Sequence, residues 1–370
     1  MCDSHITEVI EKWGIESQVV AILSDRRRNI VKGIVEHTAY DNVNCLAHNI
    51  QRAVPAGFKV ASMHDLLSKC RKIVGHFKHS STEATNLAFA CKDKEIKHLN
   101  LVQDVATRWF LSLAMAERLV MQKEAIISVL SNIDKFGITL SQTEFLHLEN
   151  LIKLLKQVKE ISDFLGGESY VMGSCYIFAI CKLEQIMGAN EEYPAYVIRF
   201  KNAFQMQELP SHCLLQEAAV DTHFKRLKGL SPQKKEEIYP RILEHLAGMH
   251  DEKQHESMEP LLKKMTMCKS LADDSDSEED TESNKRKCEL NMYRAIKPEL
   301  LATDPLDLWE KNQAAFPRMA AFEKRSLCIT ATSVPCERLL SSAGCIVEER
   351  RSSLLLDNIE KLVCLKNWLI

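Results

Sequence analysis

Residues 332–369, near the end of the chain, read TSVPCERLLSSAGCIVEERRSSLLLDNIEKLVCLKNWL. Thr332 or Ser333 can cap a helix, and Pro335 is tolerated in the first turn that follows. Leucines and an alanine at helical spacing predict a buried side, and Gly344 predicts the end of the helix. A second, largely apolar helix is then expected before the chain ends.

The start of the chain has a different pattern. HITEVIEKW (residues 5–13) has helical periodicity, whereas SQVVAILSD (residues 17–25) is a β-branched run that predicts a buried strand. RRRNIVKGIVEH (residues 26–37) returns to helical spacing, and NVNCLAHNI (residues 42–50) is a second short apolar run. The first 50 residues therefore indicate an α–β–α–β fragment of an α/β sheet.

Most of the remaining chain is expected to be helical. From about residue 60 to residue 265 the apolar residues recur at helical spacing, with a break at Gly166–Gly167. DDSDSEEDTESNKRK (residues 273–287) is acidic and then basic, and we interpret it as part of a disordered linker. Its final KRK triplet is a candidate for a nuclear-import signal.

Composition limits the classes of function. The chain has 370 residues, a net charge of −3 and 13 cysteines without regular spacing. We therefore expect reduced thiols and an intracellular protein with no membrane segment. Any DNA contact would have to come from a local basic patch, because the net charge provides no general attraction for DNA.

Both ends of the chain resemble one known family. SVPCERLLSSAG, IVEERRSSL and NIEKLVCLK are similar to the C-terminal region of hAT-superfamily transposases and of their BED-type zinc-finger relatives. CLAHNI and DVATRWFLSLAMAERLV resemble motifs of the RNase H-like core of that family. No Cys-x-x-Cys plus His-x-His module precedes them, so we expect no BED finger in this sequence.

The resemblance implies a fold class that is α/β plus mostly α. We expect a partial RNase H-like core in residues 1–120 and a large helical insertion in residues 121–265. The acidic linker would occupy residues 266–292. Residues 293–370 would form the dimerisation region and include the last core helix.

The resemblance also implies the remnant of a catalytic site. An RNase H-like nuclease holds two divalent metals with three carboxylates. Asp25 matches the second acid and Glu337 the late one, whereas the first acid would lie on a strand that this sequence does not contain. The neighbouring Arg26, Arg27 and Arg28 would compete with a metal ion for Asp25. We therefore expect no catalysis and no cofactor, with Mg²⁺ or Mn²⁺ bound only if other residues completed the site.

Two further motifs have alternative interpretations. Cys45 and His48 match the core motif of the family, and the alternatives are a zinc site or a packed Cys beside a hydrogen-bonded His. Trp109, with Arg108 beside it, matches a tryptophan associated with stacking on a flipped base, and the alternative is a core Trp. The candidate DNA contacts are Arg26, Arg27, Arg28, Arg108 and Trp109.

In the family the C-terminal region contributes to dimerisation. The candidate interface residues are the apolar positions Leu339, Ile346, Leu354, Ile359, Leu362, Val363 and Leu365. The alternative is that these side chains close the core of their own domain.

These expectations give one preferred function. The chain is interpreted as a domesticated or truncated hAT transposase-like protein of the nucleus, with the cytoplasm as a second location. It would be catalytically inactive and act as a homodimer or as a heterodimer with related hAT-like proteins. The alternatives are a piece of an active metal-dependent DNA transposase, a DNA-binding transcriptional regulator, and a poorly folding remnant.

Overall fold

The computed structural model describes residues 2–25, 27–105, 108–132, 138–167, 173–186, 194–205, 212–248, 278–298, 303–346 and 355–368. The chain divides into two compact units, which are considered separately. Unit 1 comprises Met1–Cys45, Glu168–Lys182 and Pro210–Ile370, and unit 2 comprises Leu46–Gly167 and Leu183–Leu209.

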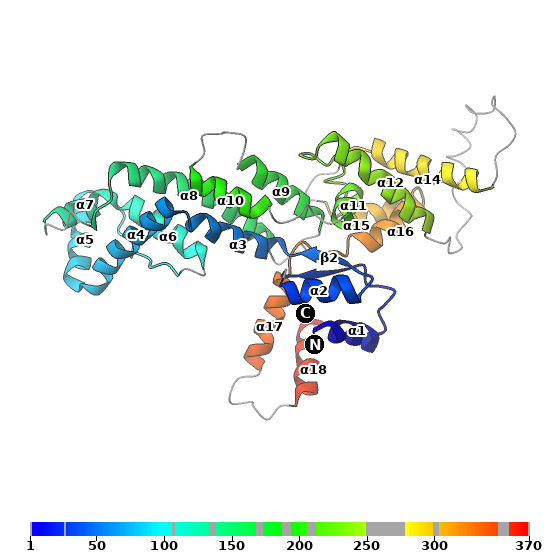
Figure 1. Cartoon of the computed structure of the whole chain (residues 1–370), viewed down its shortest axis with the longest axis horizontal. Coiled ribbons are helices and arrows are strands. Elements are labelled where there is room, and N and C mark those ends of the chain that lie inside the picture. The colour runs from blue at the N-terminus through cyan, green and yellow to red at the C-terminus, as the bar shows by residue number, and fades with distance from the viewer. Residues whose placement is uncertain are drawn as a thin grey trace. The chain divides into compact units, whose positions relative to one another are not determined.

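The first elements alternate helix and strand, as the sequence predicts. They are α1 (Cys2–Trp13), β1 (Ala21–Ser24), α2 (Arg28–His37) and β2 (Asp41–Asn44) (Figure 1). β1 and β2 pair in parallel, with Ala21 opposite Asp41, and α2 provides the crossover that a parallel pair requires. The predicted second strand ends at Asn44, because the CLAHNI segment opens a helix instead.

Within the described residues of unit 2, every regular element is a helix apart from an isolated bridge between Val105 and Arg108. The helices are α3 (Leu46–Phe58), α4 (Ala61–His79), α5 (Ser81–Asp93), α6 (Trp109–Met121), α7 (Lys123–Asn132), α8 (Gln142–Leu165) and α10 (Ala195–Gln205). A capping box formed by Ser141 and Glu144 begins α8. The helix ends at Gly166, at the break that the sequence predicts.

The rest of unit 1 is also helical. Its elements are α9 (Ser174–Ile186, which begins in this unit), α11 (His212–Val220), α12 (Pro232–Gly248), α14 (Glu278–Ala295), α15 (Pro305–Asn312), α16 (Pro317–Ser326), α17 (Val334–Ile346) and α18 (Leu356–Trp368). An aromatic core joins three of them. The Tyr293 ring stacks on Trp309 at 5.0 Å between centroids, and both rings meet Phe316 edge-on.

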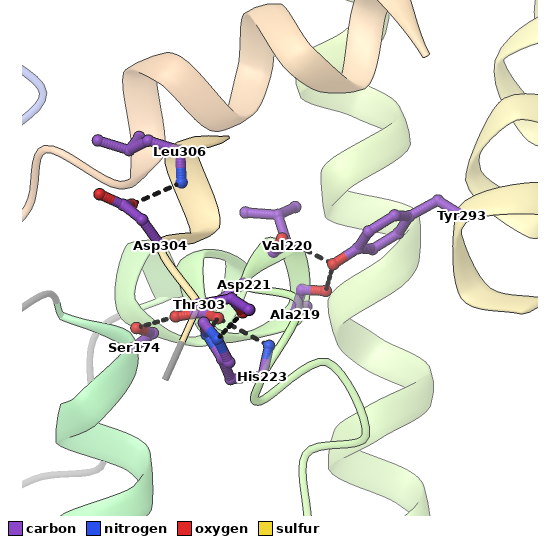
Figure 2. Close-up of polar contacts among 9 residues, drawn as sticks. All are labelled: Ser174, Ala219, Val220, Asp221, His223, Tyr293, Thr303, Asp304 and Leu306. Atoms are coloured by element: carbon purple, nitrogen blue, oxygen red, sulfur yellow. Dashed lines mark hydrogen bonds and ion pairs between the residues drawn. The ribbon is translucent and has the colours of Figure 1, made fainter. Parts of the chain in front are cut away.

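A buried polar network fixes the segment after α11. The Asp221 carboxylate accepts a 2.6 Å hydrogen bond from the Ser174 hydroxyl and lies 2.9 Å from Nδ1 of His223 (Figure 2). Nε2 of His223 lies 3.1 Å from the Thr303 hydroxyl. The network satisfies a buried carboxylate and joins the start of α9 to the segment before α15.

Several expectations need correction. The predicted linker at residues 266–292 is helical from Glu278 onwards, because Leu290 and Tyr293 of α14 are buried despite the charged sequence around them. Residues 266–277 lie outside the described residues. α17 continues past Gly344 to Ile346. The predicted boundary at residue 120 falls inside α6 and coincides with no boundary of either unit.

Candidate functional site

The carboxyl ends of β1 and β2 form one edge of unit 1. Ser24 closes β1, and its carbonyl accepts a 2.9 Å hydrogen bond from the amide of Cys45, directly after β2. The Ser24 hydroxyl donates to Oδ1 of Asn42 at 3.0 Å. Because parallel strands present their carboxyl ends at one edge, Asp25 and Cys45 leave the sheet on the same side.

The Asp25 carboxylate is bound by the residue two positions further along. Nε of Arg27 lies 2.9 Å from Oδ2, and the Arg27 backbone amide donates to Oδ1 at 3.2 Å. Arg28 is exposed at the start of α2, and Arg26 lies outside the described residues. Asp25 therefore holds a turn, and a metal ion at this position would have to displace a guanidinium.

Cys45 connects this edge to the start of α17. Its sulfur lies 3.5 Å from the Thr332 hydroxyl and accepts a hydrogen bond from the Ser333 amide at 3.3 Å. Cys45 and Thr332 are both buried, although 287 positions separate them in sequence. His48, the second member of the predicted core motif, is half-buried in the first turn of α3.

Glu337 lies in the first turn of α17 and is exposed. The Ser333 hydroxyl donates to its Oε1 at 3.2 Å, and the Glu337 amide donates to the Ser333 carbonyl at 3.1 Å. The Glu337 side chain thus contacts the residue that directly precedes its own helix. Cys45 thus contacts both the end of β1, next to Asp25, and the segment before α17, the helix that carries Glu337. The segments of the two predicted catalytic acids therefore meet in one part of unit 1.

The residue types that usually bind metals are dispersed over the described part of the chain. Within it, no group of three or more His, Cys, Asp and Glu residues is arranged to hold a metal ion. Cys70 is buried in α4, and burial raises the pKa of its thiol to about 12. A thiol in that environment resists the deprotonation that metal coordination requires.

Trp109 does not have the exposure that stacking on a base requires. Its side chain is 1% exposed, and its ring stacks on Phe110 at 3.9 Å between centroids. The core interpretation therefore replaces the predicted DNA contact at Trp109, because a buried ring offers no open face. Arg108 precedes α6 and is exposed.

The same motif contains a buried acid whose partner the sequence does not reveal. Asp104 is buried and pairs with Arg71 of α4 through two hydrogen bonds, from Nε at 2.7 Å and from Nη2 at 2.9 Å. The Ser112 hydroxyl donates to the same carboxylate at 3.0 Å. The hydrogen bond to Asp104 raises the pKa of Arg71. The acid at the start of DVATRW is visible in the sequence. Its partner Arg71 lies 33 positions away, so the pair could not be predicted.

The helix pair at the end of unit 1 is poorly covered by its own chain. α17 packs against α18 (Figure 1), yet among the residues of both helices whose side chains are described, none is buried. Leu362 is 41% exposed, Leu365 48% and Leu340 70%. Leu339, Ile359 and Val363 are half-buried, whereas the side chain of Ile346 and all of Leu354 lie outside the described residues.

The first of these helices was expected to bury the leucines and the alanine that precede Gly344. This expectation is wrong, because Leu340 is exposed and Leu339 and Ala343 are only half-buried. We refer to the exposed side chains of Leu340, Leu362 and Leu365 as the apolar stripe; they are side chains that a partner could cover. Separately, no described helix has both the length and the hydropathy that a bilayer span needs.

Comparison with known proteins gives two family matches. Residues 289–369 match the hAT family C-terminal dimerisation region, and residues 43–154 match the ZBED1 RNase-like helical domain. The first match contains α17 and α18, whereas the second runs from β2 into α8.

Individual relatives agree with these matches. Two Zea mays proteins, named as AC and AC9 transposases, are 22% and 21% identical over 98% of this chain, which covers 50% and 51% of their lengths. Zinc finger BED domain-containing protein 4 of Homo sapiens is 23% identical over 88% of this chain and 29% of its own length. The chain thus spans about half the length of the maize relatives and less of the human one.

Proposed function

Because this chain is an hAT-derived, ZBED-like protein, we propose that it works as a self-associating interaction protein rather than as a nuclease. The observation that carries the proposal is the exposed apolar stripe of α17 and α18, within the residues that match a dimerisation region. Two copies could cover each other's stripes. Homodimers and heterodimers with related hAT-like proteins both fit this surface, and the nucleus is the proposed location.

The proposed lack of catalysis is supported by the surroundings of the two acids. Arg27 binds the Asp25 carboxylate at 2.9 Å, and Glu337 accepts a hydrogen bond from Ser333. Both contacts are local, which suits a turn and a helix start. A metal-dependent nuclease would need these carboxylates for its metals instead.

Self-association can be tested by light scattering behind a sizing column. We expect the wild-type chain to have twice the 42.2 kDa mass of one copy, and Leu362→Asp to have the mass of one copy. A matched control is Leu306→Asp in α15, because Leu306 is 51% exposed and Leu362 is 41% exposed. A single-copy mass for the wild type, or an equal loss of association in both variants, would contradict the proposal.

The absence of catalysis needs its own assay. We expect no nicking of supercoiled DNA by the full chain in Mn²⁺ or Mg²⁺. Metal-dependent nicking that disappears in both Asp25→Asn and Glu337→Gln would instead establish a working nuclease. The exposed carboxylate of Asp65 in α4 provides a control variant, Asp65→Asn.

A further inference from the structure

A pocket of about 540 Å³ in unit 1 brings together an unusual number of cations. It lies between the turn after α11, the start of α12 and the C-terminal end of α14. Its cationic side chains are Lys225, Arg226, Lys228, Lys235, Arg294 and Lys297. Among the described residues that line it, Glu236 is the single carboxylate. The pocket is therefore strongly positive in a chain whose net charge is −3.

The turn that supplies three of these cations has a fixed backbone. Leu227 has φ +46°, which is rare for a bulky residue, and Gly229 has φ +95°. The Leu227 side chain is 1% exposed, and a Cβ on Gly229 would lie 2.5 Å from the Cys181 sulfur. Surrounding packing thus holds a strained turn, which places Arg226 and Lys228 on either side of Leu227. Strain of this kind is found preferentially at functional sites.

The end of α14 is anchored beside that turn. The Tyr293 hydroxyl donates to the carbonyls of Val220 at 2.6 Å and Ala219 at 3.3 Å (Figure 2). The Lys225 ammonium is buried, donates to the Tyr293 carbonyl at 2.8 Å and lies 4.6 Å from the centre of the Tyr293 ring. These contacts fix Lys225 and the end of α14, so this part of the pocket is held in place before any ligand arrives.

Favourable interaction with a helix dipole explains the position of some of these cations but not of all. Arg294 and Lys297 lie at the C-terminal end of α14, where cations are favourable in any protein. Lys235 lies in the first turn of α12, a turn without an acid, where a cation is unfavourable. In the described structure, none of Arg226, Lys228, Lys235 and Lys297 forms an ion pair with a carboxylate. An anionic ligand would attract each of these cations and offset the repulsion between them.

We propose that this pocket binds a small organic anion that carries two or more phosphate groups. Its volume lies in the range that suits a ligand of nucleotide size. Arginine and lysine are the usual partners of phosphate oxygens. A compact cluster fits a small polyanion better than a nucleic-acid backbone, which needs cations spread along a groove.

Calorimetry on the full chain tests the proposal, with inositol hexakisphosphate and ATP as probes in buffer without divalent metal. We expect saturable binding that weakens between about 50 mM and about 300 mM NaCl. Arg226→Glu combined with Lys228→Glu should weaken binding ~10-fold or more. Lys324→Glu combined with Arg325→Glu, which changes exposed cations of α16 by the same charge, should leave the affinity within about twofold.

A second variant separates loss of binding from loss of folding. Lys297 lies just beyond α14 and outside the strained turn. Lys297→Glu should therefore weaken binding and leave the turn and the thermal unfolding of the chain unchanged. The proposal is overturned if neither probe binds saturably, or if the pocket and control variants bind alike. It is also overturned if a duplex of about 20 base pairs binds through these cations and neither probe competes with it.

Discussion

At the scale of single residues, Asp25 shows how one neighbour changes what a carboxylate can do. Its place after a β-strand and its resemblance to a catalytic acid can both be recognised from the sequence, although β1 is half-buried except at Ser24 and not the buried strand that was expected. The adjacent arginines suggested competition with a metal, and Arg27 indeed binds both carboxylate oxygens through its side chain and its backbone. Sequence alone could not assign this role to one arginine, because it depends on the backbone path between β1 and α2.

Asp104 gives a quantitative test at the same scale. We expect Asp104→Asn to lower the free energy of unfolding by ~2–4 kcal/mol, because Arg71 loses its bidentate partner and stays half-buried. Urea denaturation followed by circular dichroism would measure the change. The control is Asp163→Asn in the exposed pair with Lys159 of α8, where the expected change is below about 0.5 kcal/mol. Equal losses in the two variants would show that Asp104 has no special structural role.

At the scale of elements, α14 explains why residues 278–292 are helical and not part of a disordered linker, as was predicted. Its sequence is strongly charged, which usually indicates disorder. However, Leu290 and Tyr293 lie three residues apart and pack into the core. Glu289 is also buried, and its carboxylate accepts a 2.8 Å hydrogen bond from the Met319 amide in the first turn of α16. The many charged residues dominate the composition of the segment, so composition does not reveal the short buried face of α14.

Glu323 in α16 makes the stability of unit 1 depend on pH. Burial raises the pKa of its carboxyl from the ordinary 4.5 to about 8, and the charges of Asp221 and Asp304 add to the shift. The folded chain therefore keeps a proton that the unfolded chain releases, so stability falls as pH rises from about 4.5 to about 8. Glu323→Gln stays neutral and should remove this loss.

The expected result is a gain of ~1–2 kcal/mol in the free energy of unfolding at about pH 9, with little change at about pH 5. Denaturant titrations at the two pH values would measure it. The control is Glu310→Gln at an exposed position of α15, which should have the same small effect at both pH values. A gain for Glu323→Gln that does not depend on pH would rule out the buried proton as its cause.

At the scale of the whole molecule, local periodicity predicted the opening α–β–α–β order and the helical character of the rest. It could not predict how the chain divides, because unit 1 is assembled from three separate stretches. The contact of Cys45 with Thr332 across 287 positions is one result of that assembly. The candidate interface residues were proposed through family resemblance, and Leu362 and Leu365 are exposed although α17 packs against α18.

The most direct test of the proposed interface is hydrogen–deuterium exchange of the wild-type chain below and above the concentration at which it self-associates. We predict that amides of α17 and α18 become more protected as the protein associates, while those of α15 stay unchanged. Association with the new protection confined to other helices, or with no change in α17 and α18, would contradict the account.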